Sequence, residues 1–198
     1  MELIPKQIIG KKYDTVYSMT FKNSLLAKQK YQSASKKLLH INGWGFVSKN
    51  TLDTDFFLCN NQGKKVYRYP LINDYIKIDL VGPGSTLGAG YDWVKIEQII
   101  IKEEEDDASF ISIRVRPASS PINADESIAH FFDDKATSTF IVSRKKNIVK
   151  AEIHGRNEIP NNSSSNLLDN IRNALVAKAA NIKFSDVQWN NLCKGFLS

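Results

Sequence analysis

The sequence predicts an α+β fold in which a curved antiparallel sheet packs against a C-terminal helix. Apolar and polar residues alternate in residues 75–80 and 110–116, which is the period of strands with one buried face. Apolar residues recur at helical spacing in residues 27–41, 168–179 and 189–196. A long run of strands between an early helix and terminal helices is the element order of an α+β domain.

The first predicted elements are a short strand over residues 15–21 and a helix that begins at Asn23 or Ser24 and runs to about Ile41. Either residue can cap the helix, because its side chain can accept a hydrogen bond from the first turn. One apolar stripe follows the helix and comprises Ala27, Tyr31, Ala34, Leu38 and Ile41. We therefore expect an N-terminal basic amphipathic helix whose stripe faces the core.

Short strands are expected over residues 44–47, 56–59 and 66–69, and residues 75–101 form a hairpin around a glycine-rich loop. The loop lacks the Lys-Ser/Thr pair and the following helix of a phosphate-binding loop. We interpret it as a flexible hairpin loop, with a lid over a pocket as the alternative. The glycines that would give such a lid its freedom are Gly82, Gly84, Gly88 and Gly90.

The second half continues the sheet and ends in helices. Five consecutive acidic residues, 103–107, predict a solvated hairpin tip. The next strand places Arg114 and Arg116 on one face, where they could hold an anion or pair with acidic residues across the sheet.

A short helix is expected over residues 125–132, and residues 137–144 and 148–154 form a hairpin. One helix is expected to begin near Asn166, and a last short helix at Ser185 buries Trp189, Leu192, Cys193 and Phe196.

In this element order the chain resembles the helix-grip family of small-ligand-binding proteins. The resemblance rests on a strand, a helix, a run of antiparallel strands and a final helix. It implies a curved sheet that grips a terminal helix.

Composition narrows the class of protein. A chain of 198 residues with 42% hydrophobic residues is long enough for one core, so residues 1–198 are expected to form a single domain. No apolar run approaches the ~20 residues needed to span a bilayer, and the N-terminus lacks the apolar core of a signal peptide, so a cytoplasmic location is expected. Cys59 and Cys193 are too few for a disulfide framework or a zinc site. We expect no metal and no cofactor.

The positive charge is concentrated at the N-terminus. Residues 1–50 contain nine lysines against Glu2 and Asp14, a local charge of +7, whereas the whole chain carries +6. This asymmetry predicts a surface for an acidic protein or nucleic acid on the early helix. A solvated lysine-rich face is the alternative. The proposed partner-binding residues are Lys28, Lys30, Lys36 and Lys37.

One group of residues resembles an enzyme site. Glu152 and His154 project from the same face of a strand, and Arg156 follows them. A carboxylate beside an imidazole can tune it for general-base work, and Arg156 could hold an anionic substrate. Cross-strand hydrogen bonding with a salt bridge at a strand end is the alternative. Because no nucleophile or metal motif accompanies these residues, catalysis is not the main prediction.

The function predicted for the chain is binding of a small, largely apolar molecule in a pocket between sheet and helix. Aromatic residues recur through the strands, and pockets are usually lined by such residues with a few polar groups. The proposed ligand-binding residues are Tyr67, Tyr69, Tyr91, Trp93, Glu152, His154 and Arg156. The alternative is that the aromatic side chains fill a core instead.

Overall fold

A computed structural model of the chain describes residues 2–48, 54–80, 85–105, 107–161 and 185–198. The helix expected near Asn166 lies outside the described residues, as do Gly82 and Gly84.

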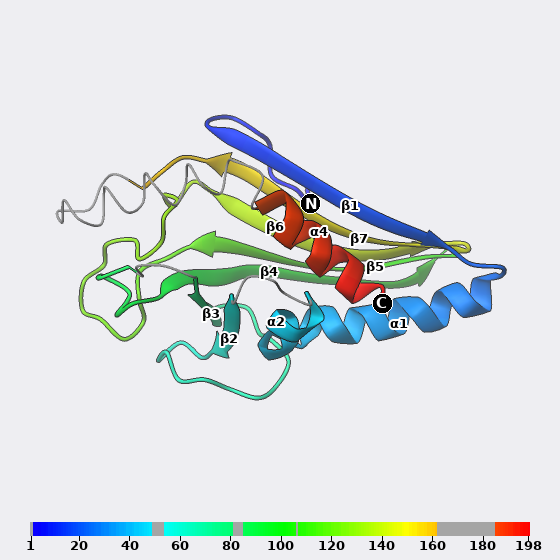
Figure 1. Cartoon of the computed structure of the whole chain (residues 1–198), viewed down its shortest axis with the longest axis horizontal. Coiled ribbons are helices and arrows are strands. Elements are labelled where there is room, and N and C mark those ends of the chain that lie inside the picture. The colour runs from blue at the N-terminus through cyan, green and yellow to red at the C-terminus, as the bar shows by residue number, and fades with distance from the viewer. Residues whose placement is uncertain (1, 49–53, 81–84, 106, 162–184) are drawn as a thin grey trace.

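Seven antiparallel strands form one sheet in the order β1-β7-β6-β5-β4-β3-β2 (Figure 1). The elements in chain order are β1 (Lys11–Thr20), α1 (Ser24–Leu39), η1 (Ile41–Gly43), α2 (Trp44–Val47), β2 (Asp55–Cys59), β3 (Tyr75–Asp79), β4 (Asp92–Glu105), β5 (Ala108–Pro117), β6 (Thr137–Lys145), β7 (Ile148–Glu158) and α4 (Ser185–Phe196). The predicted α+β fold, with its antiparallel sheet, C-terminal helix and early amphipathic helix, is confirmed.

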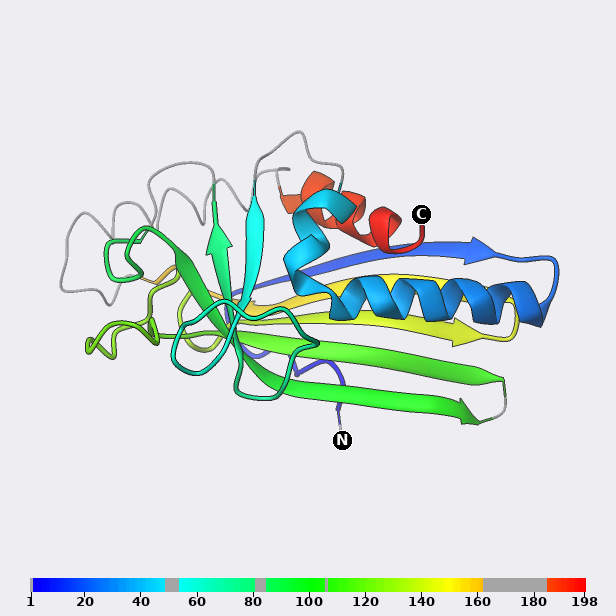
Figure 2. The ribbon, with the colours of Figure 1, turned by 90° about the horizontal axis from the view of Figure 1, so that it is seen from below.

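Both long helices lie on the same face of the sheet, which we call the inner face (Figure 2). Helix α1 packs on β6 and β7, and α4 packs on β1 and β7. Leu26 N donates to Asn23 Oδ1 at 2.9 Å, so Asn23 caps α1 as expected. Ala27, Ala34 and Leu38 of the predicted stripe are buried.

The inner core is organised around Trp44. Its ring centroid lies 5.5 Å from that of Phe56 on β2, 4.7 Å from Phe140 on β6 and 5.9 Å from Phe196 on α4. Three strands separate β2 from β6, which in a flat sheet would place them about 19 Å apart. One side chain touches residues of both because the sheet curves, and Figure 2 shows β2 and β3 steeply inclined to the long strands.

Three local predictions were wrong. Residues 44–47 form α2 and not a strand, because Trp44 is drawn into the core and its Nε1 donates to Leu38 O at 3.0 Å. Residues 66–69 are not a strand, because the chain turns around the Arg68–Asp74 ion pair after one bridge to Cys59. Residues 125–132 are not helical. There Ser127 N donates to Asp125 Oδ1, a local bond that competes with helix formation.

Helix α4 approaches α2 closely at Gly195. A Cβ atom built on Gly195 would lie 1.9 Å from the backbone oxygen of Val47. Because the obstacle is backbone and not a flexible side chain, the two helices would have to separate.

We predict that Gly195→Ala lowers the free energy of unfolding by about 2 kcal/mol, since overpacking a close helix contact forces the backbone to move. Urea denaturation measures the change. Val187→Ala, at an exposed position of the same helix, is the control and should change stability by less than about 0.5 kcal/mol. Equal midpoints for Gly195→Ala and the parent protein would show that this contact is not tight.

Candidate functional site

The face of the sheet opposite the helices, the outer face, is polar. Alternate residues of β5 lie in the inner core, and the residues between them, including Arg114 and Arg116, face outward. Glu97 of β4 accepts hydrogen bonds from Arg114 Nε at 2.5 Å and Arg116 Nε at 2.7 Å. Burial alone would raise the pKa of Glu97, but the two guanidinium groups outweigh it and lower that pKa. Of the two roles considered for these arginines, the structure shows the cross-strand ion pair.

Hydrogen bonds attach the N-terminal segment, residues 2–10, to strands β5 and β7. Asn157 Oδ1 accepts from Ile8 N at 2.8 Å and Ile9 N at 3.1 Å, and its Nδ2 donates to Lys6 O at 3.1 Å. At the other end of the segment, Arg114 Nη1 donates to Glu2 O at 3.3 Å. These bonds hold the segment against Arg114 of β5 and against Asn157, near the end of β7.

Strands β1 and β7 bring Asp14, Glu152, His154 and Arg156 together. His154 Nδ1 lies 2.6 Å from Asp14 Oδ1, and its Nε2 lies 3.4 Å from Glu152 Oε2. Arg156 Nη2 lies 2.7 Å from the same Asp14 oxygen. Asp14 is the direct cross-strand partner of His154 in the sheet register. The structure therefore groups the three residues proposed from sequence and adds Asp14.

Both ring nitrogens of His154 face carboxylates. Burial alone would lower the pKa of His154, but the hydrogen bonds to Glu152 and Asp14 outweigh it and raise that pKa above its ordinary value. The hydrogen bond from His154 is also the main reason why the pKa of Glu152 is lowered. An imidazolium that donates both N–H groups to carboxylates has no lone pair with which to take a proton from a substrate. The geometry fits an ion-pair role better than a general base.

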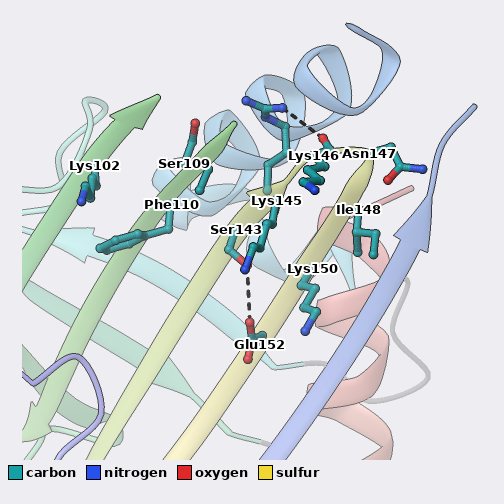
Figure 3. Close-up of a pocket in the computed structure, with 12 residues that line it drawn as sticks. Lys102, Ser109, Phe110, Ser143, Lys145, Lys146, Asn147, Ile148, Lys150 and Glu152 are labelled. Atoms are coloured by element: carbon teal, nitrogen blue, oxygen red, sulfur yellow. Dashed lines mark hydrogen bonds between the residues drawn. The ribbon is translucent and has the colours of Figure 1, made fainter. Parts of the chain in front are cut away.

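A hollow of about 610 Å³ opens on the outer face at the tips of the two central hairpins (Figure 3). We call it the outer-face hollow. Its basic lining residues are Lys102, Arg144, Lys145, Lys146 and Lys150, and the others are Ala108, Ser109, Phe110, Ser143, Asn147, Ile148 and Glu152.

One cross-strand row crosses the hollow. Lys102 of β4 pairs with Phe110 of β5, Phe110 pairs with Ser143 of β6, and Ser143 pairs with Lys150 of β7. Three strand spacings, about 14 Å, separate the two ends of this row. The hollow thus has a lysine at each end, with an aromatic ring and a hydroxyl between them.

The hollow is positively charged. Among the described residues that line it, Glu152 is the only acidic one. Glu152 is already engaged, because Ser143 Oγ donates to its Oε1 at 3.4 Å and His154 faces its Oε2. The Arg144 guanidinium is held by protein atoms, because its Nη1 donates to Ser24 Oγ at the start of α1 and to Lys146 O, both at 3.0 Å. The flexible lysines supply the charge that a ligand would meet.

The four aromatic residues proposed to line a pocket lie in separate places. Trp93 is fully buried in a small cluster with Cys59 and Ala129, and its Nε1 donates to Gly88 O at 3.1 Å. Tyr91 lies at the margin of that cluster. Tyr67 and Tyr69 are 82% and 54% exposed on the segment between β2 and β3. None of them lines the outer-face hollow, and their ligand-binding role stays a prediction.

The described part of the proposed lid is a tight turn. Gly88 N and Gly90 N both donate to Ser85 O, at 3.2 and 2.8 Å. A Cβ atom at Gly88 would lie 1.8 Å from Tyr91 O, which explains the glycine. The turn precedes the first residue of β4, whereas the hollow lies at the last residues of that strand. A lid role for these glycines stays a prediction.

Two lysines of the basic helix bind the end of α4. Lys37 Nζ donates to Gly195 O at 3.0 Å and to Ser198 O at 2.8 Å, and Lys30 Nζ donates to Ser198 O at 3.1 Å. Cations at a helix C-terminus are favoured by its unpaired carbonyl groups. Lys28 and Lys36 are exposed. A role for the four lysines in binding an acidic partner stays a prediction.

No motif in the sequence distinguishes the lysines of the hollow from other surface lysines. Alternation places Phe110, Lys145 and Lys150 on the polar sides of their strands, and this was the only available signal. Lys102 and Lys150 belong to strands that are three positions apart in the sheet. Their convergence depends on strand order, which no local pattern contains.

In the described part of the chain, no group of three or more His, Cys, Asp and Glu side chains is arranged to hold a metal ion. None of the described helices combines the length and the apolar character that crossing a bilayer requires.

No family model matches the chain, and no curated protein matches it. Solved structures are similar at low identity. The hypothetical protein jhp0584 from Helicobacter pylori is 9% identical, with 92% of this chain and 84% of that chain covered, at a TM-score of 0.44.

Two plant proteins show the same level of similarity. The ginseng major latex-like protein 151 from Panax ginseng is 12% identical over 92% of this chain and 99% of that chain, at a TM-score of 0.32. Norcoclaurine synthase from Thalictrum flavum is 10% identical over 96% and 98%, at a TM-score of 0.37. At these TM-scores the similarities support no conclusion about function, which must come from the site.

The His154 cluster predicts a specific pH dependence of stability. Because the pKa of His154 is raised in the folded state, its contribution is complete below the unfolded pKa of about 6.5 and disappears as pH rises through the folded pKa. Because the pKa values of Asp14 and Glu152 are lowered, their contributions exist above about pH 4 and disappear as pH falls. The cluster stabilises most between these limits.

We predict that His154→Gln lowers the free energy of unfolding by about 1–2 kcal/mol near pH 5.5 and by much less above about pH 8. Urea denaturation at several pH values gives the profile. His40→Gln, at an exposed histidine, is the control and should show no such profile. A loss for His154→Gln that is the same at all pH values would contradict the ion-pair account.

Proposed function

We propose that the protein binds a small organic anion in the outer-face hollow. The observation that carries this proposal is the row from Lys102 through Phe110 and Ser143 to Lys150, which lines a hollow of about 610 Å³. This volume falls within the range of about 300–1,000 Å³ that is typical of small-molecule sites.

The lining defines the class of ligand. Lysine ammonium groups on flexible stems suit a phosphate, sulfonate or carboxylate without imposing one geometry. Phe110 offers a ring face, and Ile148 adds apolar surface on β7, two strands away from Phe110. We expect a molecule that carries one anionic group and an aromatic or apolar body, with the anion near Lys145 or Lys150 and the body over Phe110.

This proposal keeps small-molecule binding, as the sequence analysis predicted, but moves it to the other face of the sheet. On the inner face, the ring of Trp44 contacts the rings of Phe56, Phe140 and Phe196. Glu152 is the residue common to the earlier ligand-binding set and the hollow. Its contacts with Ser143 and His154 offset its charge, so an anion in the hollow does not meet an uncompensated carboxylate.

Binding without catalysis is the better account of this site. General-base chemistry needs a group with a free lone pair within hydrogen-bond distance of a substrate. His154 does not offer one, since Asp14 and Glu152 occupy both of its nitrogens.

The proposal predicts that phenyl phosphate binds at the tips of β4–β7. In a titration followed by two-dimensional amide NMR, shifts should concentrate at residues 108–110 and 143–150. Lys145→Glu combined with Lys150→Glu should weaken binding at least about tenfold, because each change replaces attraction by repulsion. Raising the salt concentration should weaken binding by the parent protein as well.

Lys135→Glu is the matched control, because Lys135 is an exposed lysine at the opposite end of β6. It should leave the affinity unchanged. The proposal fails if phenyl phosphate shifts no amide at millimolar concentration, or if the double variant binds as tightly as the Lys135→Glu control.

A further inference from the structure

The segment between β2 and β3 exposes large apolar side chains in a fixed conformation. Figure 1 shows it extending beyond the body of the sheet near β2 and β3. We call residues 64–74 the 64–74 loop. Its exposed apolar residues, with their exposed fractions, are Tyr67 (82%), Tyr69 (54%), Leu71 (57%) and Ile72 (54%). Single exposed apolar residues are ordinary, but four within six positions of one loop need an explanation.

Hydrogen bonds and one ion pair fix the loop. Arg68 binds Asp74 through both of its Nη atoms, at 2.5 and 2.9 Å. Asp74 Oδ2 also accepts from Leu71 N at 2.8 Å, and Asp74 O accepts from Ile96 N at 2.8 Å. At the other end, Asn42 Nδ2 donates to Val66 O at 2.8 Å. The apolar side chains are therefore held outward by an ordered backbone.

The loop is also basic. It contains Lys64, Lys65 and Arg68, and its one acidic residue, Asp74, is buried against Arg68. Lys65 Nζ lies 4.3 Å from the ring centroid of Phe57 and 5.2 Å from that of Tyr67. The ammonium group of Lys65 thus lies near the exposed ring of Tyr67 in the same loop.

We infer that the 64–74 loop docks the protein on an anionic lipid surface. Tyrosine rings favour the boundary between headgroups and acyl chains, leucine and isoleucine enter the apolar layer, and lysines pair with anionic headgroups. All three kinds of residue occur in this loop. The inference is independent of the proposed function, because no residue of the loop lines the outer-face hollow.

The composition favours lipid over other partners. Protein interfaces are depleted in lysine, whereas Lys64 and Lys65 are adjacent and both exposed. Single-stranded nucleic acid would use Tyr67 and Tyr69 for stacking, but Leu71 and Ile72 have no aromatic face to offer a base. A lipid surface uses the apolar and the basic residues together.

Cosedimentation with vesicles tests the inference. The protein should bind vesicles that contain about one-third phosphatidylserine in phosphatidylcholine, and bind pure phosphatidylcholine at least about tenfold more weakly, since each basic residue near an anionic surface contributes roughly fivefold. Leu71→Asp with Ile72→Asp should abolish binding. Lys64→Glu with Lys65→Glu should reduce binding at least about tenfold.

The chain offers matched controls on α1. Leu25→Asp with Leu26→Asp changes two exposed leucines, and Lys28→Glu with Lys36→Glu reverses two exposed lysines. Both control pairs should bind vesicles like the parent protein, and circular dichroism should show that all four double variants are folded. The inference is overturned if the parent protein does not sediment with phosphatidylserine vesicles, or if the control pairs lose binding as completely as the loop variants.

Discussion

The contact between Trp44 and three aromatic rings determines how the rest of the molecule is arranged. Trp44 joins α2 to β2, β6 and α4, and its Nε1 binds the last turn of α1. Two strands that have three others between them, β2 and β6, both contact this one side chain, so the sheet must curve over it. Buried aromatic side chains each remove about 150–250 Å² from water, so this cluster is a major source of core stability.

On the inner face, Trp44 and the aromatic rings that it contacts lie in the core, whereas the outer face carries ion pairs and exposed lysines. Its ion pairs join Glu97 of β4 to Arg114 and Arg116 of β5, and His154 of β7 to Asp14 of β1 and to Glu152 of its own strand. These ion pairs engage the carboxylates of Glu97, Asp14 and Glu152. The lysines at the hairpin tips have only Glu152 among the acidic residues that line their hollow, and Glu152 is itself held by His154. In the proposed function, the contact with His154 reduces the repulsion that Glu152 would exert on a bound anion.

Local signals were enough to predict much of the fold. The Asn23 cap, the stripe of α1 and the β6–β7 hairpin depend on residues close in sequence. The failures have physical causes. Residues 44–47 have a strand-like composition, but contacts with distant rings made them helical.

The site could be predicted only in part. Alternation correctly placed Glu152 and His154 on one face of their strand. Asp14 lies 140 residues from His154 and reaches it only because the first strand of the chain pairs with the last. The row from Lys102 to Lys150 depends on strand order in the same way.

We propose that a ligand binds on the outer face and not among the aromatic rings around Trp44. Intermolecular nuclear Overhauser effects from the ring protons of bound phenyl phosphate test it most directly. The account predicts cross-peaks to Phe110 and Ile148 and none to the aromatic protons of the inner core. Cross-peaks to Trp44, Phe140 or Phe196 would contradict it and would place the ligand between the sheet and the helices.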